Sequence, residues 1–68
     1  MKAIEITDAT LSFVMFLVAM NVKFIYDYGK FIILGTSDID KFRSYCIKNG
    51  VRKADITRMA FASTFYEL

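Results

Sequence analysis

Few residues of this 68-residue chain are of types that catalyse reactions. The sequence has no histidine and a single cysteine, Cys46. A lone cysteine cannot form an internal disulfide, and no histidine is present to complete a zinc site or a thiol–imidazole pair with it. Glycine-rich phosphate loops and the Gly-x-Ser-x-Gly elbow of hydrolases are also missing from the sequence. We therefore expect no enzymatic activity, no metal and no cofactor, and we expect Cys46 to lie in the core.

Asp8 is the one carboxylate whose position in the sequence could support metal chemistry, because it directly follows a predicted strand. This position resembles that of the metal-binding aspartate in small ferredoxin-like nucleases, which pair two such residues across a dimer. An aspartate between a strand and a helix also serves as a helix N-cap, where it accepts hydrogen bonds from first-turn amides. We expect capping by Asp8 or Thr7, and a metal-dependent nuclease that uses Asp8 is the less favoured alternative.

The charge distribution suggests a second kind of site. Residues 41–58 contain six basic residues and one acidic residue, which gives this window +5 while the whole chain carries +2. The six are Lys41, Arg43, Lys48, Arg52, Lys53 and Arg58. Such a strip could bind nucleic acid or another polyanion, because basic side chains release counterions from phosphates. The solvated outer face of a helix explains the same charges, so nucleic-acid binding ranks as the alternative function.

Alternating apolar residues predict the strands that position these groups. Strands are expected at residues 2–7, 23–28 and 31–35, and a tight turn at Tyr28-Gly29-Lys30 joins the last two. The threonine and aromatic content of residues 56–68 favours a further strand, with a C-terminal helix as the alternative.

Capping signals predict two helices. The first is expected from Ala9 to Val22. The second follows Ser37, which begins a capping-box-like Ser-x-x-Asp, and ends at Asn49-Gly50. The residues expected on its inner stripe are Ile39, Phe42, Cys46 and Ile47.

The order strand, helix, hairpin, helix, strand is that of a ferredoxin-like βαββαβ two-layer sandwich, an α+β fold. Residues 1–68 are expected to form a single small domain. The first and third strands are expected at the centre of the sheet, because residues 31–34 form a continuous apolar run. The second strand is expected at an edge, since it carries Lys23 and Asp27.

The apolar content of 56% is high for so small a chain. The apolar run at residues 11–20 is too short to span a membrane, and the first residues lack the order of a signal peptide, so a cytoplasmic location is expected. We therefore attribute the apolar surplus to an interface with another protein or with a second copy of the chain.

The first predicted helix is apolar on both faces. One face contains Phe13, Phe16, Leu17 and Met20 and can pack on the sheet, while the opposite face contains Leu11, Met15, Val18 and Val22. We expect the second set to bind a partner. Two alternatives are a C-terminal helix that covers this face and a buried strand in place of the helix.

A protein that binds through such a face, without a catalytic site, has the general character of the short regulators and inhibitors that viruses and mobile elements encode. The sequence therefore predicts a small non-enzymatic protein-binding regulator, with self-association expected.

Overall fold

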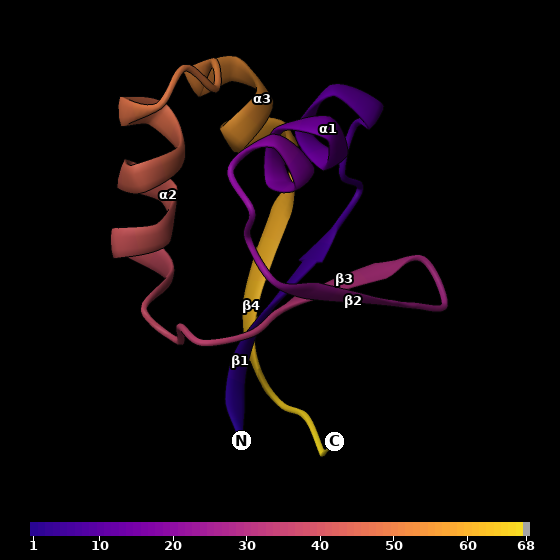
Figure 1. Ribbon diagram of the computed structural model, residues 1–68. Coiled ribbons are helices and arrows are strands. Elements are labelled where there is room, and N and C mark those ends of the chain that lie inside the picture. The colour runs from indigo at the N-terminus through magenta and orange to yellow at the C-terminus, as the bar shows by residue number, and fades with distance from the viewer. Residues whose placement is uncertain (68) are drawn as a thin grey trace.

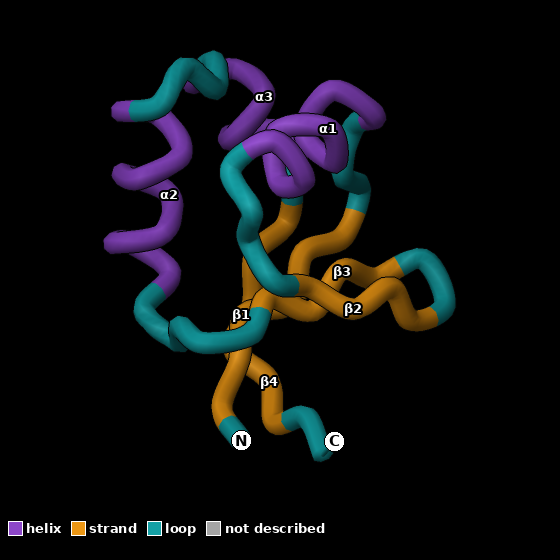
Figure 2. Tube along the Cα trace, viewed as in Figure 1, coloured by secondary structure: helices purple, strands orange, loops and turns teal. Residues whose placement is uncertain are grey.

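The computed structural model describes residues 1–67 and shows an antiparallel four-stranded sheet with three helices (Figures 1 and 2). The strands are β1 (Lys2–Thr7), β2 (Phe24–Asp27), β3 (Lys30–Ile33) and β4 (Ala60–Phe65). The helices are α1 (Leu11–Ala19), α2 (Ile39–Lys48) and α3 (Lys53–Arg58). The predicted α+β class is confirmed.

The strand order in the sheet is β2-β3-β1-β4. The first and third strands are central and the second is at an edge, as the sequence predicts. Ile4 lies opposite Ile33 of β3 and Ser63 of β4. The two ends of the chain lie side by side, where the Tyr66 N–H donates a 2.8 Å hydrogen bond to the Met1 carbonyl (Figure 1).

All three helices pack on one face of the sheet. Ile4 and Ile6 of β1 point to this face, because alternate residues of a strand share a side. The buried core joins them to residues of β3, of every helix and of the link to β4, namely Phe13, Leu17, Ile33, Phe42, Cys46, Ile56 and Met59. The opposite face of the sheet has no helix over it in the described chain.

The first helix is shorter than predicted: it was expected from Ala9 to Val22, and it spans Leu11–Ala19. The Thr10 hydroxyl is the N-cap and accepts a 3.2 Å hydrogen bond from the Phe13 N–H. The expected caps, Thr7 and Asp8, are not used, since Thr7 belongs to β1 and Asp8 is an exposed residue with φ of 60°. The prediction that Asp8 or Thr7 caps the helix was therefore wrong.

A Schellman motif ends α1. Asn21 adopts a left-handed conformation with φ of 57°, and its N–H donates to the Val18 carbonyl at 3.1 Å. The Val22 N–H donates to the Leu17 carbonyl at 2.9 Å. The chain therefore leaves the helix before Val22, which packs against the core instead of extending the outer stripe.

The second helix begins one residue later than the sequence signal suggests. The Asp38 carboxylate, not Ser37, is the N-cap and accepts a 3.0 Å hydrogen bond from the Lys41 N–H. Its end at Asn49-Gly50 is as predicted, with Gly50 at φ of 106°. Phe42 and Cys46 are buried and Ile39 packs against them, whereas Ile47 is exposed and was wrongly placed on the inner stripe.

The predicted C-terminal strand is shorter than residues 56–68, and Leu68 lies outside the described residues. Residues 53–58 form α3, which buries Ile56 against the core, and β4 begins only at Ala60. The C-terminal helix considered as the alternative does not form, because residues 60–65 pair with β1. The element order therefore contains one helix more than predicted.

The hairpin is close to the prediction. Asp27 and Lys30 face each other across a two-residue turn formed by Tyr28 and Gly29. Both turn residues have positive φ, 48° and 82°, which is the geometry that matches the twist of two antiparallel strands. The ordered parts are Phe24–Asp27 and Lys30–Ile33, slightly offset from the predicted ranges.

Candidate interaction surfaces

The outer face of α1 exposes large apolar side chains. The exposed fractions are 76% for Leu11, 64% for Met15 and 64% for Val18. Their positions fall within about 60° of arc on the helix, while Phe13 and Leu17 on the other side are buried. Three of the four residues predicted to bind a partner therefore share one exposed stripe, which we call the α1 stripe. Val22, the fourth, does not belong to it.

No charged residue occurs between Ala9 and Val22. A surface helix normally directs charged residues toward water, and α1 instead directs apolar ones. Neither the C-terminal segment nor any other described element covers the α1 stripe, because its three side chains remain exposed within the folded chain. The buried-strand alternative is also excluded, since residues 11–19 are helical.

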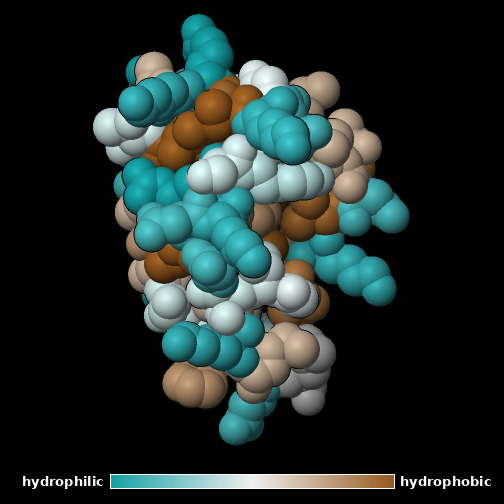
Figure 3. Space-filling view, turned by 90° about the vertical axis from the view of Figure 1, so that its left-hand side faces the viewer, coloured by the Kyte–Doolittle hydropathy of each residue, from teal (hydrophilic) through white to brown (hydrophobic). Residues whose placement is uncertain are grey.

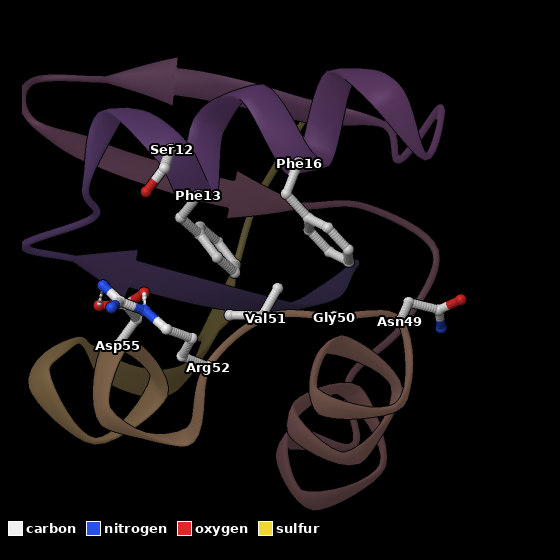
Figure 4. Close-up of a pocket in the computed structure, with 8 residues that line it drawn as sticks. All are labelled: Ser12, Phe13, Phe16, Asn49, Gly50, Val51, Arg52 and Asp55. Atoms are coloured by element: carbon white, nitrogen blue, oxygen red, sulfur yellow. Dashed lines mark hydrogen bonds and ion pairs between the residues drawn. The ribbon is translucent and has the colours of Figure 1, made fainter.

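A pocket of about 430 Å³ lies beside α1, between this helix and the connection from α2 to α3 (Figure 4). Phe13 and Phe16 of α1 point into it toward Val51. The side chain of Asn49 points away from the pocket and donates a 2.8 Å hydrogen bond to the Tyr45 carbonyl. The interior of the pocket is therefore mainly apolar.

An ion pair lies at one end of this pocket. Arg52 Nε is 3.2 Å from Asp55 Oδ2, and Arg52 Nη2 is 3.4 Å from Asp55 Oδ1, so the guanidinium holds the carboxylate through two nitrogens (Figure 4). Asp55 is buried, whereas the Arg52 side chain is 80% exposed. The pocket thus offers an apolar interior and a polar end to any group that enters it.

The sequence does not identify this pocket. Its residues come from α1 and from residues 49–55, which run from the end of α2 into α3 and are far from α1 in the sequence. The one local signal is the Arg52-x-x-Asp55 spacing, which brings opposite charges together in a helical turn. The packing that places Val51 opposite Phe13 is tertiary.

The basic residues of the 41–58 window do not form one uniform strip. Arg43 stacks on the Phe61 ring, with its guanidinium carbon 5.4 Å from the ring centroid. Arg52 is paired with Asp55, and Lys41, Lys48, Lys53 and Arg58 are exposed. Hydrophilic side chains cover much of the side of the molecule on which α2 lies, with apolar areas between them (Figure 3).

Asp8 is exposed at the end of β1. Within residues 1–67 no group of three or more histidine, cysteine, aspartate or glutamate side chains could hold a metal ion. The left-handed backbone at Asp8 belongs to the turn between β1 and α1.

Cys46 is completely buried in α2, as predicted. Desolvation by burial raises the pKa of its thiol from 9.0 to about 11. A thiol in this environment stays protonated near neutral pH and is a poor nucleophile.

None of the helices in residues 1–67 combines the length and the apolar character needed to cross a membrane. Comparisons of the chain with protein-family models, curated proteins and solved structures found no match.

Proposed function

We propose that this protein is a small non-enzymatic regulator or inhibitor that binds another protein through the α1 stripe. The supporting observation is the exposure of Leu11, Met15 and Val18 on a helix without charged residues. An exposed apolar stripe of this kind is costly in water and is typical of an interaction site.

The occupant we propose is a partner that covers the α1 stripe and places an apolar side chain in the adjacent pocket. Burial of the three largely exposed side chains contributes roughly 1 to 2 kcal/mol each. Two copies meeting only through this stripe would gain roughly 6 to 12 kcal/mol, while association costs roughly 4 to 15 kcal/mol. A different protein that also fills the pocket gains the additional apolar area that specific binding needs.

We further propose that the fold is a variant of the ferredoxin-like sandwich, with α3 inserted before the last strand. The antiparallel order β2-β3-β1-β4 and the packing of every described helix on one face support this assignment. The fold supports many unrelated functions, so it does not add to the functional argument.

The experiment is affinity capture from the source cells followed by mass spectrometry, with wild type compared with the double variant Met15→Glu/Val18→Glu. Two carboxylates in the stripe would be desolvated by a bound partner, so we expect at least a tenfold loss of the captured protein. The matched control is Ile47→Glu, an exposed apolar residue of α2, which should capture as wild type does.

Circular dichroism must show that all three proteins are folded. Equal capture by wild type and a folded double variant would contradict the proposal. Loss of capture by Ile47→Glu as well would place the binding surface elsewhere.

A further inference from the structure

The strand β4 presents an open backbone edge. Within residues 1–67 it is the last strand of the sheet and pairs only with β1. Met1 and Tyr66 exchange hydrogen bonds of 3.2 and 2.8 Å. This hydrogen-bonded pair shows which residues of β4 direct their backbone groups toward β1. Hydrogen-bonded pairs alternate along antiparallel strands, so Ala62 and Thr64 also direct their backbone groups to β1. Phe61, Ser63 and Phe65 direct theirs away from the sheet.

This edge lacks the features that normally prevent pairing. Within residues 1–67, the one hydrogen bond to the outward groups is a long contact of 3.5 Å from Thr64 Oγ1 to the Phe65 carbonyl. Residues 60–66 contain no charge, no proline and no glycine. Exposed edges are usually protected by charged residues, prolines or bulges, because unpaired strands recruit other strands.

The other edge of the sheet is different. β2 has four residues, follows Lys23 and ends with Asp27. With Lys23 paired to Leu34 through a 3.0 Å hydrogen bond, only Phe24 and Tyr26 direct backbone groups outward. β4 is therefore the longer and less protected edge.

We propose that β4 pairs antiparallel with β4 of a second copy of this chain, so that two four-stranded sheets become one continuous sheet of eight strands. The two-fold axis would pass beside Ser63. Each Ser63 would then lie opposite its own copy, and Phe61 of each chain would lie opposite Phe65 of the other.

In this register, the residues of β4 that would lie opposite each other in the two chains are compatible. A two-fold axis places a central residue opposite its own copy, so a charge there would repel itself, and Ser63 is neutral. Phe65 is 81% exposed in the single chain, and pairing gives it an aromatic neighbour across the strands. On the other face of the sheet, Ala62 of each chain would lie opposite Thr64 of the other chain. Both side chains are small enough to allow the strands to approach closely.

α2 packs against β4 on the face of the sheet that carries Phe61. It contacts β4 near its beginning, where Phe42 and Phe61 have ring centroids 6.4 Å apart and Arg43 lies over Phe61. Ala62, Ser63 and Phe65 remain exposed, so the edge beyond Phe61 is accessible. The second copy's Phe65 would lie next to the ring that Arg43 already covers.

This interface is separate from the α1 stripe, so each can fail without the other. The test uses the full chain in a dilution series followed by light scattering, with Ser63→Pro as the decisive variant. Proline is tolerated where a strand's N–H faces outward, and it removes the central outward donor of the edge. We expect wild type to dimerise, and Ser63→Pro to keep the wild-type circular dichroism spectrum while its dissociation constant rises at least tenfold.

Further variants of Ser63 distinguish a loss of dimerisation from a loss of folding. Ser63→Ala keeps the N–H and should dimerise like wild type. Ser63→Lys and Ser63→Glu should each dimerise more weakly, by up to about fivefold, and an equimolar mixture of the two should recover dimers, because opposite charges would then face each other.

Amide hydrogen exchange gives a residue-level readout. The amides of Phe61, Ser63 and Phe65 should become protected as wild-type concentration rises, while those of Ala62 and Thr64 are protected at every concentration. A wild-type monomer throughout the series would overturn the proposal. So would a folded Ser63→Pro dimer, or a dimer lost in Met15→Glu/Val18→Glu and kept in Ser63→Pro.

Discussion

The backbone N–H of Val22 lies 2.9 Å from the carbonyl oxygen of Leu17 and donates a hydrogen bond to it. Together with the left-handed Asn21, this bond ends α1 and turns Val22 toward the core. Val18, only four residues earlier, is exposed on the opposite side of the chain. Two valines at a helical spacing therefore have different surroundings, and the same substitution at each should have different effects.

Val22→Glu should destabilise the protein by about 2 to 3 kcal/mol, because the carboxylate would lose water where Val22 packs against the core. Val18→Glu should change the free energy of unfolding by less than about 0.5 kcal/mol, because its side chain stays in water. Urea unfolding followed by circular dichroism measures both. A similar loss at the two positions would mean that the stripe is buried within one chain.

Tyr28→Asn should stabilise the protein by about 1 kcal/mol. Tyr28 has φ of 48°, a region that asparagine tolerates better than tyrosine, and Asn-Gly is the preferred sequence for a two-residue turn with both φ values positive. The tyrosine side chain is 97% exposed, so little packing is lost. The urea midpoint should rise at constant slope. Tyr28→Ala is the matched control and should give no such gain, since alanine is equally strained there.

Cys46 should make the protein less stable at alkaline pH. The folded-state pKa of about 11 lies above the ordinary value of 9.0, so the unfolded chain releases its proton first as pH rises. The contribution to stability is complete below about pH 9 and is lost as the pH rises toward 11. The free energy of unfolding of Cys46→Ala should depend less on pH in this window. Identical pH profiles for the two proteins would exclude this origin.

The thiol should react with an aromatic disulfide reagent far more slowly in the folded protein than in urea. Both burial and the raised pKa reduce the concentration of accessible thiolate. Fast reaction in native buffer would show that α2 opens readily.

The basic window should not produce specific nucleic-acid binding at physiological salt, because Arg43 and Arg52 are engaged within the chain. Fluorescence anisotropy with a labelled DNA duplex at several salt concentrations tests this. Binding whose logarithmic salt slope flattens by about two units in Lys41→Ala/Lys48→Ala would instead support the polyanion-binding alternative.

The sequence by itself determines the strands and the approximate positions of the main helices, since side-chain periodicity and turn residues are local properties. Lys2–Thr7 was predicted with its observed bounds, and Asn49-Gly50 marks the observed end of α2. Both signals depend on neighbouring residues alone: alternation places Ile4 and Ile6 on one face, and glycine adopts the positive φ that ends a helix. The apolar stripe at Leu11, Met15 and Val18 was recognisable for the same reason.

The tertiary structure alone decides which apolar residues are covered. Val22 has the same helical spacing as the residues of the α1 stripe, yet it packs against the core because the helix ends before it. The α3 helix is six residues long, too short to be stable alone, and packing of Ile56 against the core fixes it. The pocket between Phe13 and Val51 and the open edge at Ser63 likewise depend on contacts between distant segments, because burial is a property of the packed chain and not of local sequence.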